Sequence, residues 1–109
     1  MAKPSRGRGV TQQLSARPVL LTDMDRTLRR HYPNEARAQQ IEGHARLQLV
    51  VSRRGRPSQL RVIESVGHPA FGEACRRAVA RSRWRPARDR SGDRVATRIL
   101  YRCKFEVDS

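Results

Sequence analysis

The segment from His44 to Val66 constrains the fold more than any other part of the sequence, because two alternating stretches flank a single turn. Alternation of apolar and polar residues is typical of a strand with one buried face. Arg53–Pro57 is predicted to form the turn, with Gly55 at positive φ and Pro57 at the start of the second strand. The residues that we expect to be buried are Ala45, Leu47, Leu49 and Val51 in the first strand, and Leu60 and Val62 in the second.

Helical patterns lie on both sides of this predicted hairpin. Pro33 suits the first position of a helix and Gly43 suits the left-handed residue that ends one, so we expect a helix over residues 33–43. Residues 68–83 carry an apolar stripe at helical spacing, with arginines on the opposite face, and predict a second helix. The stripe consists of Phe71, Ala74, Cys75, Ala78, Val79 and Ser82.

The C-terminal part of the chain predicts one more strand. After a loop over residues 85–93, residues 95–107 alternate again and indicate a long final strand. A right-handed crossover through the second helix returns the chain to the sheet, where this strand pairs antiparallel with the first one. The expected fold is therefore α+β, a three-stranded antiparallel sheet in the order 2-1-3 with two helices on one face and the final strand at an edge.

The N-terminal residues are expected to lie outside this domain. Residues 1–17 are rich in Arg, Gly, Ser and Gln, and their few apolar residues do not offset the entropy of ordering, so we predict a flexible basic arm. Residues 18–109 form the predicted domain. Within it, Pro18–Arg30 has apolar residues at roughly helical spacing and is expected to be a short helix or a strap against the domain.

The charge of the chain is strongly positive. It contains 24 Lys and Arg residues against 10 Asp and Glu residues, for a formal net charge of +14. Such a surface attracts polyanions at low salt, so the charge predicts the sign of a partner and not its identity. No apolar run is long enough for a membrane span or a secretory signal.

Cysteines and histidines give no sign of a metal or catalytic site. Cys75 and Cys103 lack the spacing of a zinc or redox site, and we expect them to be small buried apolar residues, with a disulfide as the alternative in an oxidising compartment. The histidines are scattered and have no acidic or thiol partner at ligand spacing. There is no glycine-rich phosphate loop and no Ser/His/Asp set, so we expect neither an enzyme nor a cofactor.

A series of short motifs runs through the predicted elements in one order. They are Tyr32-Pro33-x-x-Ala36, Glu42-Gly43 before an alternating strand, Gly55 at the hairpin, Phe71-x-x-Ala74-Cys75-x-x-Ala78-Val79, Trp84-x-Pro86-Ala87, and a final strand that ends in Phe105. Together they resemble the C-terminal domain of the TonB family over about residues 18–107. Two positions depart from the family pattern, because Ser82 stands where a tryptophan is usual and Pro57 replaces a common valine.

The resemblance implies a mechanical function. Domains of this family are periplasmic, belong to inner-membrane-anchored proteins, capture a short segment of an outer-membrane transporter, the TonB box, and transmit force to the transporter's plug. The membrane helix that engages the family's proton-driven motor, and the proline-rich spacer after it, are not in these residues. Coupling to a motor is therefore expected only through regions outside this sequence. The alternatives are a piece of a longer protein and a TonB-like domain used elsewhere.

The final strand is the expected binding site, because an exposed edge strand accepts an extended peptide through its unpaired backbone groups. The resemblance adds a second set just before Tyr32-Pro33, in the region beside the bound segment in the family. The candidate partner-binding residues are Arg98, Ile99, Leu100, Tyr101, Arg102, Cys103 and Lys104 in the strand, and Arg29, Arg30 and His31 before the first helix. The alternative role for the strand's cations is protection of the edge against aggregation.

Other functions stay open from the sequence alone. The domain is alternatively a scaffold or anchor in another envelope machine, such as a motility or secretion complex. A basic nucleic-acid-binding module is a further alternative, although the aromatics are expected in the core and leave few rings for base stacking, so nucleic acid is not an expected partner. A homodimer through the long edge strand is also considered, because small domains with such an edge readily pair.

Overall fold

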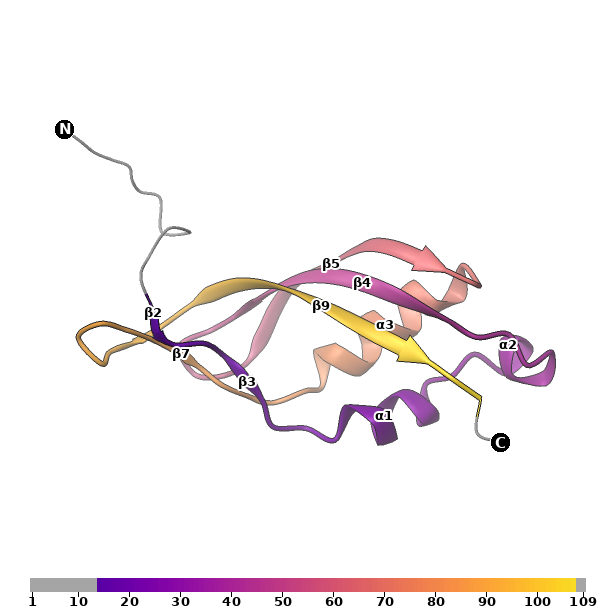
Figure 1. Ribbon diagram of the computed structural model, residues 1–109, viewed down its shortest axis with the longest axis horizontal. Coiled ribbons are helices and arrows are strands. Elements are labelled where there is room, and N and C mark those ends of the chain that lie inside the picture. The colour runs from indigo at the N-terminus through magenta and orange to yellow at the C-terminus, as the bar shows by residue number, and fades with distance from the viewer. Residues whose placement is uncertain (1–13, 108–109) are drawn as a thin grey trace.

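A three-stranded antiparallel sheet is the centre of the structure, a computed structural model that describes residues 14–107. The elements in chain order are β2 (Leu14–Ala16), β3 (Val19–Leu20), α1 (Met24–Arg30), α2 (Asn34–Ala38), β4 (Gly43–Val51), β5 (Pro57–Val66), α3 (Ala70–Ala80), β6 (Trp84–Arg85), β7 (Ala87–Asp89), β8 (Arg94–Val95) and β9 (Thr97–Phe105). The sheet has the order β5-β4-β9, with β4 in the middle (Figure 1). The predicted α+β fold and the strand order 2-1-3 are confirmed.

The core lies between the sheet and α3. One face of β4 is fully buried, with Ala45, Leu47, Leu49 and Val51 at 0% exposure, as the alternation predicted. Each Leu or Val buried in this way contributes about 1.5–3 kcal/mol. Helix α3 packs across β4 and β5 and is the predicted second helix with narrower bounds. Its stripe is buried, so the helical period in the sequence correctly identified the face that contacts the sheet.

Three aromatic rings fill the core near the start of β4. The rings of Phe71 and Phe105 stack with centroids 4.4 Å apart and an interplanar angle of 7°. The Tyr32 ring stands edge-on to both, at 5.7 Å from Phe71 and 5.5 Å from Phe105. Its hydroxyl donates a hydrogen bond of 2.5 Å to the carbonyl oxygen of Ile41, which satisfies the one polar atom of the cluster. Burial raises the pKa of Tyr32, and the Glu42 carboxylate adds to the effect.

The first predicted helix is much shorter than expected. Helix α2 ends at Ala38, and the left-handed residue that follows it is Gln40, with φ of 56°, instead of Gly43. Two hydrogen bonds close this end, from the Ile41 amide to the Ala36 carbonyl at 2.8 Å and from the Gln40 amide to the Arg37 carbonyl at 3.0 Å, which is the Schellman pattern. The prediction that Gly43 occupies the left-handed position was wrong, because Gln40 adopts that conformation.

Gly43 is instead the first residue of β4, and its lack of a side chain serves close packing. A Cβ atom there would collide with the carbonyl oxygen of Val66 and lie 3.0 Å from the Phe71 ring. Glycine is therefore needed at this position because β4, β5 and α3 converge on it, and not because a helix ends there.

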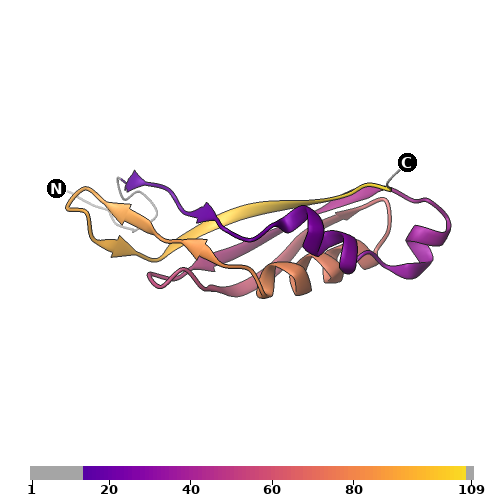
Figure 2. The same cartoon turned by 90° about the horizontal axis from the view of Figure 1, so that it is seen from below.

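The helix that shares a face of the sheet with α3 is α1, and not the one predicted over residues 33–43. Helices α1 and α3 lie on the same side of the sheet, whereas α2 lies beyond its end (Figures 1 and 2). The Asp23 carboxylate caps α1 by accepting the Arg26 amide at 3.2 Å. Met24 and Leu28 are its buried residues. The segment expected to be a short helix or a strap thus contains both a short strand and a helix.

Short strands occupy two regions where none was expected. The predicted loop over residues 85–93 contains β7, which pairs with both β2 and β8, while β3 pairs with β6. The predicted flexible arm falls mostly on residues 1–13, outside the described residues, but the prediction was wrong for Leu14–Ala16, because these residues form β2. The final strand also starts later than expected, at Thr97, after a break at Ala96. Pattern analysis missed these strands because two or three residues carry no measurable period.

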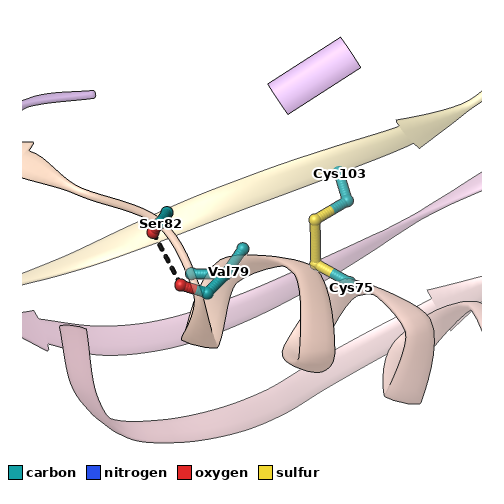
Figure 3. The surroundings of a disulfide bond; sticks show 4 residues. All are labelled: Cys75, Val79, Ser82 and Cys103. Atoms are coloured by element: carbon teal, nitrogen blue, oxygen red, sulfur yellow. Dashed lines mark hydrogen bonds between the residues drawn. A yellow bond between two sulfur atoms is a disulfide. The ribbon is translucent and has the colours of Figure 1, made fainter. Parts of the chain in front are cut away.

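Ser82 fills the position where the resemblance led us to expect an aromatic ring. It is fully buried, and its hydroxyl donates to the Val79 carbonyl oxygen at 2.6 Å (Figure 3). The Ser82 hydroxyl oxygen in turn accepts a 2.7 Å hydrogen bond from the indole nitrogen of Trp84. A serine is compatible with the core here because each polar atom has a partner, and it fixes the orientation of the Trp84 ring.

Candidate functional site

The two edges of the sheet differ in regularity. β9 pairs with β4 over nine consecutive residue pairs, from Gly43↔Phe105 to Val51↔Thr97, without any register irregularity. The pairing of β5 with β4 has two irregularities, and Gln59 within β5 adopts a φ of 51°. Bulges and bends protect a strand edge from further pairing. The regular edge of β9 is therefore the one suited to accept another strand.

One expectation about the core is overturned in β5, at the edge of the sheet. Val62, expected to be buried, is 38% exposed, while Leu60 packs partly against the core as predicted. Val62 nevertheless lies on the predicted face, opposite the buried Leu47 and against Gly72 of α3, and it is partly exposed because β5 is an edge strand of the sheet.

The outer edge of β9 carries no paired strand among residues 14–107. All seven strand residues that were predicted as a binding site lie on this edge strand. Their side chains divide by alternation, with Ile99, Tyr101 and Cys103 on the helix side and Arg98, Leu100, Arg102 and Lys104 exposed on the open face of the sheet. The structure therefore brings these residues together, but only the backbone is shared by all of them as a contact surface.

Cys103 differs from its neighbours because it is joined to Cys75 of α3 by a disulfide, with the Cα atoms 5.8 Å apart (Figure 3). The preferred expectation of two separate buried thiols was wrong, and the alternative of a disulfide is correct. The Cys103 side chain is fully buried, so it is not available to a partner. The bond instead ties the edge strand to the helix behind it, and disulfides of this kind are typical of oxidising compartments.

A small depression of about 210 Å³ lies between α1 and the end of β9. It brings one residue of the second predicted set, Arg29, together with Lys104 of the first set. The other lining residues are Asp25, Leu28, Tyr32 and Glu106. Asp25 also contributes to the raised pKa of Tyr101, which is caused mainly by burial, so α1 lies close to the helix side of β9. An extended segment added to β9 would pass beside this depression.

Arg30 and His31 do not join this arrangement. They line a different depression of about 400 Å³, together with Tyr32, Pro33, Asn34 and residues of α3. His31 is the C-cap of α1, and its Nδ1 lies 2.9 Å from the Thr27 carbonyl oxygen. The second predicted set is thus divided between two depressions that have only Tyr32 in common. The sequence analysis missed Asp25, although its spacing of four residues from Arg29 places both on one helix face.

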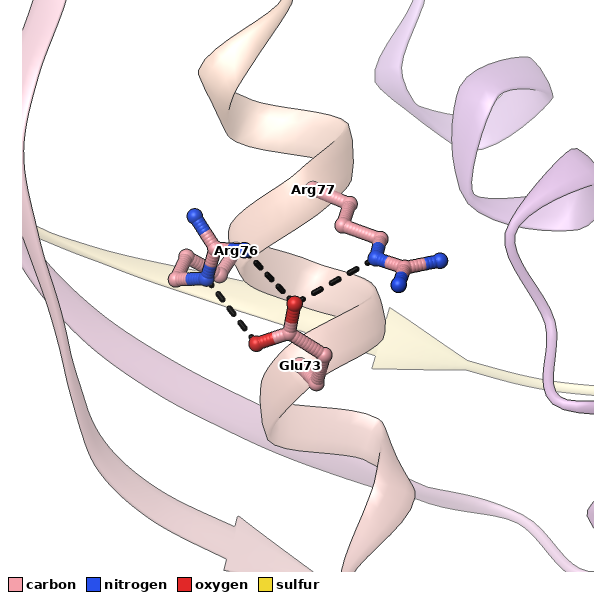
Figure 4. Close-up of polar contacts among 3 residues, drawn as sticks. All are labelled: Glu73, Arg76 and Arg77. Atoms are coloured by element: carbon pink, nitrogen blue, oxygen red, sulfur yellow. Dashed lines mark hydrogen bonds and ion pairs between the residues drawn. The ribbon is translucent and has the colours of Figure 1, made fainter.

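Two of the arginines on α3 share one acid of the same helix, which offsets one of their two positive charges. Arg76 donates to both carboxylate oxygens of Glu73, at 2.9 Å and 2.6 Å, and Arg77 donates to one of them at 3.3 Å (Figure 4). The hydrogen bonds from Arg76 lower the pKa of Glu73 from 4.5 to about 2. This part of the arginine face consequently has less positive charge for a polyanion than the sequence suggests.

We expect the Glu73 carboxylate to titrate with a midpoint near pH 2, in place of its ordinary 4.5. Because the pKa is lower in the folded state, its contribution to stability is present above pH 4.5 and is lost as the pH falls toward 2. Carboxyl carbon chemical shifts followed by NMR measure the midpoint directly. In an Arg76→Gln control the midpoint should rise toward 4.5, and a wild-type midpoint already at that value would contradict the ion pair.

The described part of the chain has neither a cluster of potential metal ligands nor a helix of membrane-spanning character. Residues 14–107 contain no group of three or more His, Cys, Asp or Glu side chains that could hold a metal ion. His68 instead lies 3.2 Å from Glu35, and His44 lies 3.8 Å from Glu64. None of the helices in this range is long and apolar enough to span a membrane.

Comparison with known proteins identifies the family. The family model described as Gram-negative bacterial TonB protein C-terminal matches residues 29–107. The solution NMR structure of the Pseudomonas aeruginosa TonB CTD is similar, with a TM-score of 0.58 and 29% identity over 72% of this chain and 78% of that chain. The Helicobacter pylori TonB-CTD has a TM-score of 0.52 and 13% identity over 79% of this chain and 78% of that one, which supports the fold alone. A search of curated proteins found no match. The chain belongs to the TonB C-terminal family.

Proposed function

We propose that this domain works in the periplasm, where it captures an extended segment of an outer-membrane transporter by adding it as a strand to β9 and then transmits force to it. The observation that carries the proposal is the regular and unpaired outer edge of β9 in a sheet whose other edge is irregular. The proposed activity is binding without catalysis. Coupling to a proton-driven motor would occur through regions outside this sequence.

The energetics of strand addition suit a reversible connection. Each backbone hydrogen bond contributes about 1 kcal/mol net, so about four to six bonds give a modest affinity before side chains add to it. A segment bound with modest affinity can be released after each cycle of force transmission. A reversible, force-transmitting connection requires such release.

The arrangement of β9 also provides a route for force into the domain. A load on a captured segment would pass from β9 to β4 through the nine-residue ladder. It would pass from β9 to α3 through the Cys75–Cys103 disulfide as well. The edge strand is therefore connected to the core by covalent as well as hydrogen bonds, which favours transmission of force over peeling of the strand.

Backbone amide NMR tests the proposal. We expect peptides from transporter N-termini to cause saturating shifts in residues 97–105 of isotopically labelled protein, with little change in β5. Two versions of one peptide, N-methylated at alternate residues, provide the matched control, because only one of them removes the amides that face β9. That version should bind at least about tenfold more weakly.

Three outcomes would contradict strand addition at β9. They are equal binding of the two N-methylated peptides, shifts concentrated in β5, and diffuse shifts that disappear at high salt. The last result would leave the net charge as the only basis of binding and would favour the nucleic-acid or scaffold alternatives. A concentration-dependent doubling of mass with shifts in the same residues would indicate that a second copy of the chain occupies the edge.

A further inference from the structure

The open face of β9 presents a row of exposed side chains to any strand added beside it. We call this set the open-face row, and it consists of Arg98, Leu100, Arg102 and Lys104. Leu100 is 59% exposed, the largest exposure among the large apolar side chains in the described residues. The row therefore has an apolar residue between two arginines, and this order is what a partner strand would meet.

Two cations of this row have no acidic partner in the described part of the chain. On the open face, Arg46 pairs with Glu64 at 3.5 Å and Lys104 pairs with Glu106 at 3.3 Å. No carboxylate of residues 14–107 lies within ion-pair distance of Arg98 or Arg102. The charges at these two positions are consequently available to an anionic partner.

The position of Arg102 adds an unfavourable contact that a partner would relieve. In the β4–β9 register it lies directly opposite Arg46, and like charges at opposed positions destabilise a sheet. Its guanidinium donates a hydrogen bond of 3.4 Å to Nδ1 of His44, which satisfies one N–H group but supplies no carboxylate to balance the charge. An acidic side chain on the other side of Arg102 would offset this repulsion.

The geometry of strand addition fixes the spacing of the acids. Side chains alternate between the faces of a strand, so residues p, p+2 and p+4 of an added segment would face Arg98, Leu100 and Arg102. Opposed residues on neighbouring strands have Cβ atoms about 4.5–5.5 Å apart, within reach of an ion pair. The pattern is symmetric about Leu100, so it applies to parallel and antiparallel addition alike. Residues p+1 and p+3 would face Ile99 and Tyr101, which are partly buried.

We infer that the segment captured by β9 carries two acidic residues four positions apart with an apolar residue midway between them. The carboxylates pair with Arg98 and Arg102, and the apolar side chain covers Leu100. This inference rests on the proposed strand addition and names the class of segment that the edge selects. A protective role of the same arginines against aggregation is compatible with it, because they repel a second copy of this basic edge and attract an acidic strand.

Three peptides of equal length test the spacing. The first has acids at p and p+4, the second has the same composition and net charge with acids three residues apart, and the third has amides in place of both acids. In the second peptide the acids lie on opposite faces, so only one of them can reach the row. We expect the first peptide to bind about three- to tenfold more tightly than the others at low salt. The preference should shrink as salt is raised.

Matched variants of the full chain assign the preference to its residues. Arg98→Gln with Arg102→Gln should abolish the preference, while Arg53→Gln with Arg54→Gln removes the same charge at the exposed hairpin turn and should keep it. Circular dichroism confirms folding of both. Equal binding of the first two peptides by the wild-type chain would overturn the inference. Binding of the amide peptide at residues 97–105 would still support strand addition, whereas failure of all three peptides would overturn the proposed function itself.

Discussion

Reduction of the Cys75–Cys103 disulfide is expected to lower the free energy of unfolding by about 3.5 kcal/mol and the thermal midpoint by about 15–25 °C. The bond spans a sequence separation of 28 residues, and opening it returns the corresponding loop entropy to the unfolded chain. Circular dichroism of the wild-type chain with and without a reductant measures the difference without any change of sequence.

A double substitution provides the control for this measurement. Cys75→Ala with Cys103→Ala should unfold near the midpoint of the reduced wild-type chain and should be insensitive to reductant. The control also gives the scatter of the thermal midpoint with and without reductant. If reduction shifted the wild-type midpoint by no more than this scatter, the disulfide would not stabilise the fold in solution. The expected size is large for a domain this small, because its core is limited in area.

Replacement of Phe71 with alanine is expected to cost about 3–5 kcal/mol of unfolding free energy. The side chain is fully buried, stacks on Phe105 at 4.4 Å and meets the Tyr32 ring edge-on. Truncation removes these contacts and leaves a cavity where α3, β9 and the segment before α2 meet. Urea unfolding followed by tryptophan fluorescence gives the free energy, and the single Trp84 serves as its probe.

Phe71→Leu is the matched control, because it keeps most of the apolar volume and should cost clearly less than the alanine variant. A loss below about 1 kcal/mol for Phe71→Ala would mean that the surrounding rings close the cavity, and that the cluster is less rigid than its packing indicates.

The parts of the fold that followed from the sequence are those with long, regular patterns. The alternation in β4 and the helical stripe of α3 each extend over many residues, so each pattern specified both an element and its buried face. The order 2-1-3 then followed from the handedness of the crossover. Gly55 has a φ of 79° and Pro57 opens β5, as the turn chemistry predicted.

The errors arose where tertiary contacts decide the local structure. Gln40 is left-handed and Gly43 is extended because the surrounding packing outweighs the ordinary preference for glycine at a helix end. Val62 lies on the predicted face, opposite the buried Leu47, but it is 38% exposed because β5 is an edge strand, and the cover that α3 gives such a strand cannot be read from its alternation. The disulfide could not be chosen from the sequence, since two cysteines at this spacing fit both a bonded pair and separate buried thiols.

The candidate site was predictable in its main element and not in its surroundings. The long final strand at an edge follows from the strand order, so Arg98–Lys104 could be selected without coordinates. The residues that α1 adds to the site depend on how this short helix packs against β9. The observed packing places Arg29 beside Lys104, whereas Arg30 and His31 line another depression. The irregularity of β5, which distinguishes the two edges, also appears only in the structure.

Gly43 has a further effect, on the alignments that the three strands can adopt. A slip of one residue between β4 and β5 would move Glu42 or His44 into the place of Gly43, against the Val66 carbonyl oxygen and the Phe71 ring, where a Cβ atom does not fit. The same slip would carry the buried residues of β4 to the open face. Misaligned hairpins are thus excluded by a steric clash in addition to lost burial. Every folded copy consequently has the same alignment along β9, which the proposed capture of one segment requires.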